Sequence, residues 1–378
     1  MTVITESEEL KRRIGALMSE EFVTVDTEFL REKTYYPKLC LVQIAGNDDA
    51  FAIDVLAQGI DLSPFYALMQ DENIVKVFHA ASQDLEIFVN ENGKVPTPLY
   101  DTQIAAQVLG FGEAVGYAAI VNIICKVTID KAVRHTDWSK RPLTDKQIEY
   151  AISDVTHLRE IYMVLEEKLE KKERSKWAYE EIKKTANINS YKVDVEEIWR
   201  KIKIRGGSGR YIAIVKELAK WRENRAQKSD KPRSWILSDD AILELAATCP
   251  KSIGEVKKLR FYKGSISGYI DEILQVIEVG KNAAPTELKK KKPLSDSASE
   301  QVDLLKLLLK LQAAKHDIAP SVIAKSDDIV ALVQNKNDEI PASMQGWRYD
   351  VFGQYAEKLL KGELSLSIQN GRIKILGD

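Results

Sequence analysis

Short β-rich runs fill the first hundred residues and almost disappear from the rest of the chain. Three of them lie close together, separated by polar breaks: FVTVDTEF (22–29), LCLVQIAG (39–46) and DAFAIDVL (49–56). This spacing is typical of strands joined by hairpins. A fourth run, IVKVFHA (74–80), leads into the helical pattern SQDLEIFVNEN (82–92). The combination predicts an α/β domain built on a mixed sheet.

Helical patterns dominate the remainder of the sequence. Apolar residues recur with helical spacing between about residues 208 and 280, and again between about residues 300 and 362. A segment with Pro285, Pro293 and four lysines (289–292) separates the two regions and predicts a linker. Their similar size and layout favour a duplicated module. The tail LSLSIQNGRIKI alternates around Asn370-Gly371, which predicts a hairpin with a type I′ turn.

The bulk composition excludes several classes of protein. The formal net charge is only −2, so any binding of a polyanion depends on local basic patches. Cys40, Cys125 and Cys249 are far apart with apolar flanks, which favours free thiols in a reducing compartment over disulfides or a zinc site. The polar N-terminus has no apolar signal core, and no run is long enough to span a membrane. We expect a cytoplasmic protein that does not bind membranes.

Two acids stand inside the first apolar run. Asp26 and Glu28 are two positions apart, so both side chains point to the same face of the predicted strand. Like charges on one face repel each other, and burying them without compensation is costly. A divalent cation compensates such a pair, and a set of oxygen ligands without sulfur suits Mg²⁺ or Mn²⁺. Read alone, the pair is equally consistent with a metal site and with a structural role.

Further acids lie on predicted helices. Asp84 falls in the first turns of a helix that follows a strand, where α/β folds commonly place ligand groups. Tyr150 and Asp154 are four residues apart and therefore share one helix face. Each has a plainer interpretation: a helix cap for Asp84, and a surface hydrogen bond for the other two residues. Taken singly, none of them predicts a function.

The order of these residues is more informative. An Asp-x-Glu strand, an Asp at a strand-to-helix junction and a Tyr-x-x-x-Asp helix together resemble the tyrosine-bearing subclass of the DEDD 3′–5′ exonucleases. Four segments between residues 20 and 165 resemble the ribonuclease D family: VDTEFLREKTYYPKLCLVQIA, FHAASQDLEIF, YDTQIAAQVLG and TDWSKRPLTDKQIEYAISDVTHLREIY. LAKWRENRAQKSDKPRSWILSDDAILELA resembles the first helicase-and-RNase-D C-terminal (HRDC) domain of that family, and IAPSVIAKSDDIVALV with GWRYDVFG resembles the second.

The resemblance implies both a fold and a division into domains. The expected fold class is α/β, with a ribonuclease H-like exonuclease domain that contains a mixed β-sheet, followed by two small all-α HRDC domains. The exonuclease domain is expected at residues 1–190 and the first HRDC domain at 208–288. The second, at 296–378, includes the C-terminal hairpin.

The resemblance also implies a catalytic mechanism with two metal ions, Mg²⁺ or Mn²⁺. Asp26, Glu28 and Asp154 would hold the first ion, with Asp26 bridging to the second. Asp84 would support the second ion through water, and Tyr150 would orient the attacking water. Two such ions can clamp the attacking and leaving oxygens of a phosphodiester in line. The expected product is a 5′-nucleotide released from the 3′ end.

Neighbours of these residues are candidate substrate contacts: Thr27, Phe29, His79, Gln83 and Arg141. A structural hydrogen bond is the plainer role for His79. A salt bridge that fixes its loop is the plainer role for Arg141, which follows Trp138 and precedes Pro142 in the resembling motif. Asp101 is expected to be structural.

A positively charged stretch precedes and enters the first HRDC helix, where Arg205, Arg210, Lys216, Lys220, Arg222, Arg225 and Lys228 recur. Basic grooves with stacked aromatic rings bind single-stranded RNA, although a solvated face is the plainer interpretation of these charges. We expect Trp221 and Trp235 in the core. Lys289 to Lys292 suit a solubilising linker, with RNA contact as the alternative.

Three functions fit these observations. The first is a ribonuclease D-like exoribonuclease that acts on RNA with a free 3′ end and trims tRNA precursors and other small structured RNAs as a monomer. The second is a related exonuclease that acts on DNA, since the metal site recognises the phosphodiester and not the sugar. The third is a non-catalytic nucleic-acid-binding protein. The intact set of five residues and the two HRDC regions favour the first.

Overall fold

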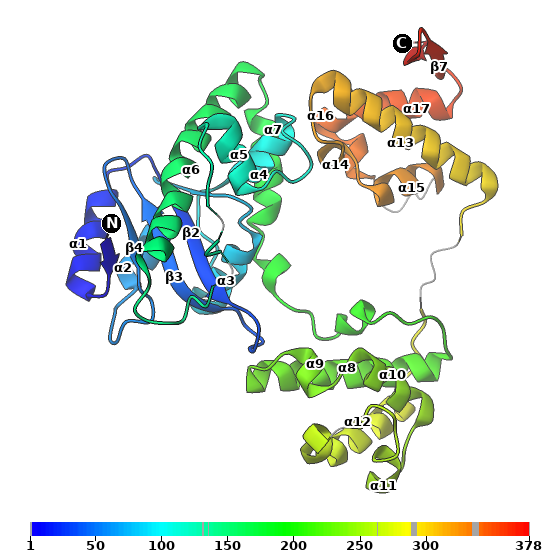
Figure 1. The fold of residues 1–378 in the computed structure, drawn as a ribbon. Helices are drawn as coiled ribbons and strands as arrows, with labels where there is room; N and C mark the ends of the chain where they lie inside the picture. Colours follow the sequence, from blue (N-terminus) through cyan, green and yellow to red (C-terminus); the bar gives the residue numbers. More distant parts are fainter. Residues whose placement is uncertain are drawn as a thin grey trace.

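The fold is described from a computed structural model, for residues 2–130, 132–134, 136–262, 264–288, 293–334 and 340–377. Figure 1 shows an α/β domain at the N-terminal end of the chain and two helical units that follow it. The lysines at 289–292, predicted as a linker with RNA contact as the alternative, lie outside the described residues. No helix in these ranges is both long and apolar enough to cross a membrane.

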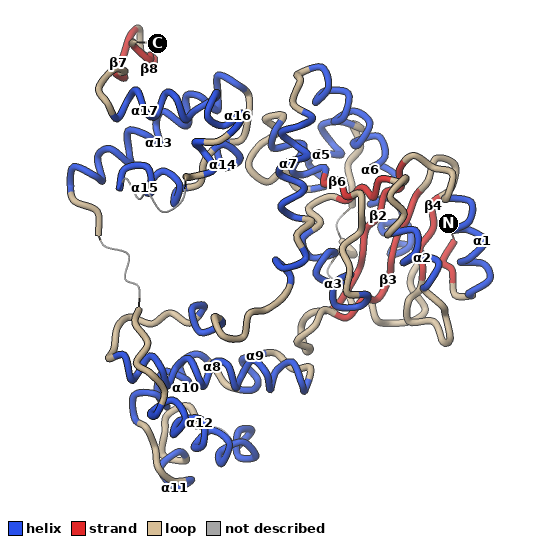
Figure 2. Tube along the Cα trace, turned by 180° about the vertical axis from the view of Figure 1, so that it is seen from behind, coloured by secondary structure: helices blue, strands red, loops and turns tan. Residues whose placement is uncertain are grey.

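A six-stranded mixed sheet forms the centre of the first domain (Figure 2), in the order β1-β4-β3-β2-β5-β6. The strands are β1 (Thr2–Ile4), β2 (Phe22–Leu30), β3 (Lys38–Ala45), β4 (Ala50–Ile53), β5 (Val75–Phe78) and β6 (Leu99–Asp101). Antiparallel hairpins join β2, β3 and β4, while β5 runs parallel to β2 and β6 parallel to β5. The predicted mixed sheet is confirmed.

Helices cover the sheet. They are α1 (Ser7–Leu17), α2 (Ser63–Met69), α3 (Ser82–Asn92), α4 (Thr102–Val108), α5 (Tyr117–Ile124), α6 (Asp145–Lys171) and α7 (Ser175–Thr185). The long helix α6 begins with a reciprocal cap between Thr144 and Gln147, a device that satisfies free N–H groups at a helix start. It lies against β2, where the Thr24 hydroxyl donates to the Val155 carbonyl at 2.8 Å.

The first helical unit has its own hydrophobic core. It contains α8 (Gly209–Ser229), α9 (Arg233–Ile236), α10 (Asp239–Thr248), α11 (Ile253–Val256), η3 (Gly264–Tyr269) and α12 (Ile270–Asn282). Two short 3₁₀ turns, η1 (Ile188–Tyr191) and η2 (Ile198–Lys201), precede it. Ile198, Trp199 and Ile202 are buried in the same core, so its packing begins before residue 208.

The second helical unit repeats part of this layout. It contains α13 (Asp296–His316), α14 (Pro320–Ile323), α15 (Ser326–Gln334), η4 (Ala342–Met344), α16 (Gly346–Arg348), a π turn η5 (Tyr349–Gly353) and α17 (Gln354–Leu360). In both units a long helix ends at an aspartate in the left-handed conformation, Asp230 or Asp317, and a one-turn helix follows. A Ser-Asp-Asp sequence then lies at the start of α10 or α15.

The C-terminal hairpin follows the second unit. Strands β7 (Ser365–Gln369) and β8 (Arg372–Leu376) pair antiparallel. Both turn residues, Asn370 and Gly371, have positive φ, at 51° and 72°. A type I′ turn requires positive φ at both central positions. The predicted hairpin is confirmed.

The two helical units contact the first domain in different ways. The buried apolar residues of the second unit belong to one continuous cluster with those of the N-terminal α/β domain. Trp177 of α7 stacks on Trp347 with ring centroids 4.4 Å apart, and Arg174 donates to the Asp317 carbonyl at 3.1 Å. The first unit instead reaches the domain through polar contacts, among them the bonds from the Tyr35 and Tyr36 amides to Asp230.

Candidate active site

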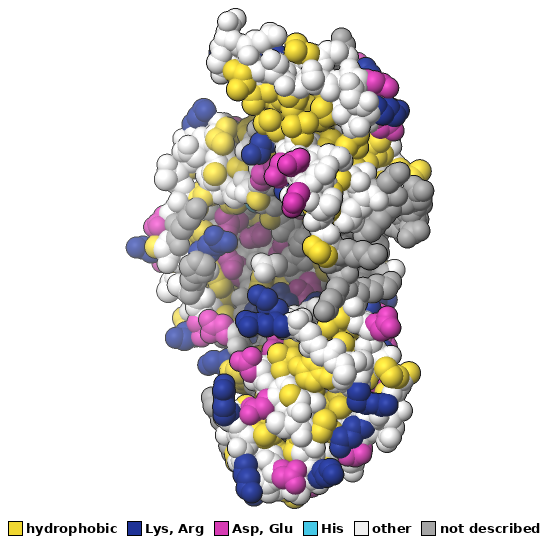
Figure 3. Space-filling view, turned by 90° about the vertical axis from the view of Figure 1, so that its right-hand side faces the viewer, with side chains coloured by type: hydrophobic (Ala, Val, Ile, Leu, Met, Phe, Trp, Pro, Cys, Tyr) yellow, Lys and Arg dark blue, Asp and Glu magenta, His cyan; other side chains and the backbone are white. Residues whose placement is uncertain are grey.

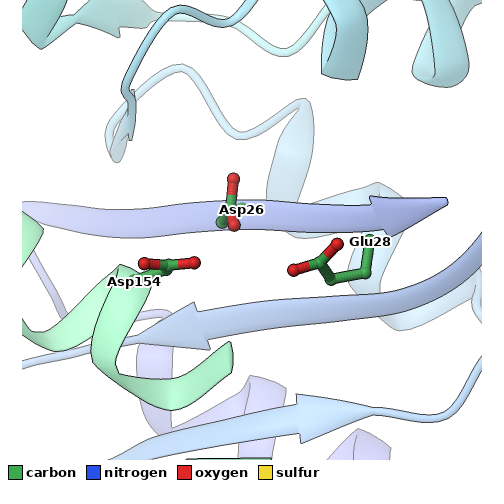
Figure 4. Close-up of side chains that lie close together, drawn as sticks. All are labelled: Asp26, Glu28 and Asp154. Carbon is green, nitrogen blue, oxygen red and sulfur yellow. The ribbon is translucent and has the colours of Figure 1, made fainter. Parts of the chain in front are cut away.

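Three elements bring the predicted acids together. Asp26 and Glu28 lie on β2, Asp154 lies on α6 and Asp84 lies in the first turn of α3. Figure 4 shows Asp26, Glu28 and Asp154 pointing into a common space beside β2. One oxygen from each of these three carboxylates lies within 4.8 Å of the others. Side chains that lie 128 positions apart in the sequence therefore form one cluster (154 − 26).

The Asp84 carboxylate is held against Thr27 of β2. This carboxylate accepts a hydrogen bond from the hydroxyl of Thr27, which lies between the two acids of β2. Asp84 and Thr27 are both buried, and the charge of Asp26 contributes to raising the pKa of Asp84. Asp84 thus belongs electrostatically to the cluster, and Thr27 fixes its orientation.

Every carboxyl group of the cluster is harder to ionise than normal. Desolvation raises the pKa of Asp26 to about 6. Desolvation and the charge of Asp26 raise the pKa of Glu28 to about 10 and that of Asp154 to about 8. Desolvation likewise raises the pKa of Asp84 well above its usual value. Crowded carboxylates in a poorly solvated site shift in this direction because each additional negative charge opposes the others.

This donor set suits divalent cations. It offers carboxylate oxygens and no sulfur, the ligand type preferred by Mg²⁺ and Mn²⁺. Asp154 Oδ1 is buried and has no hydrogen-bond partner among the described residues. Arg134 is the cation that lowers the pKa of Asp26, Glu28 and Asp154, and its effect is smaller than that of desolvation. Asp26, Glu28 and Asp154 could hold a divalent cation, which would supply the positive charge that compensates these carboxylates.

The cluster opens into a cavity of about 760 Å³. Its lining includes both acids of β2, Asp84, Asp154 and Tyr150. Desolvation and the charge of Asp154 raise the pKa of Tyr150, so its hydroxyl stays protonated at neutral pH. Between the second helical unit at the top and the first at the bottom, the face in Figure 3 is hollowed, with acidic side chains visible inside.

Four of the five predicted substrate contacts line this cavity: Thr27, Phe29, His79 and Gln83. The ring nitrogens of His79 are occupied, since Nε2 donates to the Val115 carbonyl at 3.0 Å and Nδ1 lies 2.9 Å from the Thr102 hydroxyl. These bonds support the structural alternative for His79.

Arg141 does not line the cavity. Its Nε and Nη2 both bond to the Asp54 carboxylate at 2.6 Å, and its other contacts are the backbone carbonyls of Cys40, Trp138 and Lys140. A guanidinium engaged in this way fixes the loop that follows residue 137. The geometry supports the salt-bridge alternative over contact with substrate.

Asp101 has the expected structural role. Its carboxylate caps α4 and also accepts hydrogen bonds from the amides of Ala80 and Ala81 at 3.0 and 2.9 Å. These amides belong to the turn that connects β5 to α3. Asp101 therefore fixes the turn that carries Asp84 into the cluster.

Sequence reasoning missed several cavity residues, namely Arg31, Gln103, Tyr117 and Arg134. The Tyr117 hydroxyl donates to the Ser153 carbonyl at 3.0 Å, beside Asp154 on α6. Arg134 lies four residues before Trp138 in a loop of mixed charge. Only the folded arrangement distinguishes it from the other arginines, because no spacing rule relates a loop cation to acids on distant elements.

The expected core position of Trp235 is wrong. Its side chain is 55% exposed, because α9 is a single turn that buries Ile236 and leaves Trp235 outside. Trp221 does pack against the core of its unit, and its Nε1 donates to Glu272.

Several basic side chains of α8 form ion pairs with neighbouring acids. Lys216 and Lys220 pair with Glu196, Arg225 pairs with Glu272, and Arg222 is buried against Asp239. These ion pairs support neither a fully solvated face nor a continuous free basic surface along this helix.

Comparison with known proteins agrees with this geometry. Residues 1–170 match a family model described as 3′-5′ exonuclease, and residues 212–277 match the HRDC domain model. The chain is 44% identical to ribonuclease D of Jannaschia sp. (strain CCS1), covering 99% of this chain and 98% of that one. The chain is 40% identical to ribonuclease D of Bartonella henselae, and that match covers 99% of this chain and 93% of that one.

A solved structure covers nearly the same length. The crystal structure of Escherichia coli RNase D, described as an exoribonuclease involved in structured RNA processing, superimposes with a TM-score of 0.82 and 29% identity. The match covers 96% of this chain and 98% of that one. The chain belongs to the ribonuclease D family of 3′–5′ exoribonucleases, enzymes with an exonuclease domain that uses a divalent metal and a helical HRDC region.

Proposed function

We propose that this exoribonuclease trims the 3′ ends of tRNA precursors and other small structured RNAs with two divalent ions, Mg²⁺ or Mn²⁺, and releases 5′-nucleotides. The observation that carries the proposal is the crowding of Asp26, Glu28, Asp84 and Asp154 at one cavity with raised pKa values. Such a cluster is unfavourable without cations and well suited to hold them.

Each member of the cluster has a separate role in the proposal. Asp26, Glu28 and Asp154 would hold the first ion, Asp26 would also serve the second, and Asp84 would support the second. When bound, such ions activate a water molecule and neutralise charge that develops on the scissile phosphate. Thr27 keeps the Asp84 carboxylate in place by donating a hydrogen bond from its hydroxyl to it.

Tyr150 orients the attacking water. Tyr150 lines the cavity, and its raised pKa keeps the hydroxyl proton available for hydrogen bonding. Arg134 contributes positive charge on the same cavity wall, which favours the approach of a phosphodiester. The side chains and backbone around Phe29 and Gln83 contact the terminal nucleotide.

The proposal extends to the organisation of the protein. The exonuclease domain occupies residues 1–190, and the HRDC domains occupy 208–288 and 296–378, with the chain acting as a cytoplasmic monomer. The core around Ile198 and Trp199 supports a slightly earlier start for the packing of the first HRDC domain.

A precursor tRNA with a 3′ extension tests the proposal. We expect release of 5′-nucleotides that stops when a chelator is added and resumes with Mg²⁺ or Mn²⁺. Asp26→Asn removes a ligand and should abolish release, while Asp145→Asn, the same change at an exposed acid on α6, is the matched control. Undiminished release by Asp26→Asn would overturn the assignment.

Matched RNA and DNA strands with free 3′ hydroxyls test the choice of nucleic acid. We expect faster digestion of RNA. Equal or faster digestion of DNA would favour a DNA exonuclease and would overturn the proposed substrate class without affecting the metal site.

A further inference from the structure

A second cavity, of about 540 Å³, lies where the first helical unit meets the exonuclease domain. One wall comes from the loop after β2, with Arg31 and Tyr35. The other comes from the first unit, with Lys201, Arg222 and Arg233 among its lining residues. The loop is the direct continuation of the strand that carries Asp26 and Glu28.

Specific polar contacts hold the two walls together. The Tyr35 hydroxyl donates to Glu223, which is fully buried, and Arg233 pairs with the same carboxylate. The Arg233 guanidinium lies 5.0 Å from the centre of the Tyr35 ring. The amides of Tyr35 and Tyr36 each donate to the Asp230 carboxylate at 3.0 Å. These contacts make the cavity a built feature of the junction.

Four cationic side chains line this cavity, and one of them has no acidic partner among the described residues. Four cationic side chains (Arg31, Lys201, Arg222 and Arg233) face two carboxylates, Asp239 and Asp240. Arg233, Arg222 and Arg31 have acidic partners, namely Glu223, Asp239 and Glu86. Lys201 is exposed, and no acid in the described part of the chain lies within ion-pair distance of it.

A buried donor in the wall also lacks a partner. Arg222 is only 5% exposed, and its Nη1 bonds to the Leu237 carbonyl and the Asp239 carboxylate. Its Nε is buried and has no hydrogen-bond partner among the described residues. Leaving a buried donor unsatisfied costs about 1–3 kcal/mol, so such a group commonly marks a position for a water or ligand acceptor.

The two cavities meet at one residue. Arg31 lines the cavity around the carboxylate cluster and also the cavity at the junction. An RNA strand whose 3′ end occupies the cavity around the carboxylate cluster can therefore continue past Arg31 toward the cavity at the junction. The exposed Trp235 belongs to the same one-turn helix as Arg233 and follows the lining residue Ser234 in the chain.

We propose that the junction cavity is a second RNA subsite, which binds backbone phosphates of the substrate strand several nucleotides upstream of the 3′ end, with Trp235 stacking on an adjacent base. Cationic grooves with aromatic platforms bind single strands in this way. The inference rests on the proposed exoribonuclease function and adds a named binding site to it. An RNA strand too short to reach the junction gains no affinity from this subsite.

Charge reversal at Lys201 tests the subsite. Its matched control is Lys203→Glu, the same change two residues further at an exposed lysine that does not line the cavity. For the full chain, we expect Lys201→Glu to raise KM for a single strand of about ten nucleotides on the order of tenfold more than it raises KM for a dinucleotide. Lys203→Glu should show no such difference between the two lengths.

Binding measurements separate a phosphate contact from a general loss of folding. In the Asp26→Asn background, which prevents cleavage, fluorescence anisotropy gives Kd for the longer strand at several salt concentrations. Loss of one phosphate contact through Lys201→Ala should lower the slope of log Kd against log salt by about 0.7. Trp235→Ala should weaken binding of the longer strand about tenfold with little change in this slope, and Trp235→Phe should restore most of it.

The outcomes distinguish this inference from the proposed function. If the wild-type chain releases no nucleotides from RNA, the proposed function fails. If the wild type is active but Lys201→Glu and Lys203→Glu give the same length dependence, the junction cavity is not an RNA subsite. Equal weakening of dinucleotide and longer strand by Lys201→Glu would also overturn the inference, because the subsite lies beyond the reach of a dinucleotide.

Discussion

Carboxyl groups are shielded from water both at the cluster beside β2 and at the junction around Glu223. Their pKa values shift in opposite directions at the two sites. At the cluster, desolvation and neighbouring acids raise the pKa of Glu28 and Asp154. At the junction, burial alone would raise the pKa of Glu223, but the bonds from Arg233 and Tyr35 outweigh it and lower the pKa. The described residues do not fully compensate the charges of the cluster, whereas they do compensate the charge of Glu223.

This difference separates a binding site from a structural contact. A buried acid whose partners belong to the fold stabilises the fold, and removing a partner leaves an uncompensated charge. A group of buried acids with too few partners destabilises the fold until a ligand supplies the missing charge.

Substitution within the cluster should affect activity far more than substitution at the junction. We expect Asp154→Asn to lower kcat on a short RNA by at least about a thousandfold, because it removes a ligand needed for metal-ion catalysis. Glu223→Gln should change kcat by less than about tenfold. Steady-state kinetics at saturating Mg²⁺ provide the measurement, and similar losses in both variants would contradict the distinction.

Substitution at the junction should affect stability more. Glu223→Ala leaves Arg233 without its buried partner, and we expect a loss of about 3 kcal/mol in the free energy of unfolding of the first helical unit. Asp26→Asn should instead stabilise the metal-free protein, because it removes one of several repelling charges. Urea unfolding in the presence of a chelator measures both, and destabilisation by Asp26→Asn would count against the proposed crowding.

Metal ions should stabilise the protein through the cluster alone. At a free Mg²⁺ or Mn²⁺ concentration of one hundred times Kd, binding to the folded state contributes about 2.7 kcal/mol. We expect this gain in Glu223→Gln and its loss in Asp154→Asn. Thermal unfolding with and without metal is the measurement, and an equal gain in both variants would place the ions elsewhere.

The metal-free protein should become less stable as the pH rises. Because the folded-state pKa values of Asp26 and Asp154 are raised to about 6 and about 8, the folded state binds more protons than the unfolded state above about pH 4. The free energy of unfolding therefore falls between about pH 5 and pH 8. Saturating metal should remove much of this slope. The contribution of Glu223 to the free energy of unfolding has the opposite pH dependence. Because the pKa of Glu223 is lowered in the folded state, its stabilising contribution is lost in acid.

Removal of one hydroxyl at the junction should have the smallest effect. Tyr35→Phe deletes the donor to Glu223 and keeps the ring beneath Arg233, so we expect a loss of about 1 kcal/mol. Tyr66→Phe, a hydroxyl deletion at a half-buried tyrosine far from the junction in sequence, is the control. An effect no larger than the control would show that the hydroxyl adds little to the junction.

Much of the fold followed from local patterns. The runs 22–29, 39–46 and 74–80 became β2, β3 and β5, and the pattern at 82–92 became α3 with the same bounds. Period-two and period-3.6 spacing are properties of a few adjacent residues, so the sequence displays them directly. The edge strands β1 and β6 were not predicted, because three residues are too few to show a period.

The packing between elements was not accessible in the same way. Nothing in the order of residues predicted that Trp235 would be exposed, that Arg222 would be buried against Asp239, or that the second helical unit would share a core with the exonuclease domain. These outcomes depend on which surfaces meet, and that is decided by contacts between residues far apart in the chain.

The sequence by itself determined the chemistry of this protein: Asp26 and Glu28 share a face because strands alternate, and Tyr150 and Asp154 share a face because helices repeat every 3.6 residues. Only the tertiary structure decided what surrounds that chemistry. It brought Arg134 to the cluster, occupied Arg141 with Asp54, and joined the loop after β2 to the first helical unit through Tyr35 and Glu223. Periodicity is local, whereas charge compensation depends on distant residues that only folding brings together.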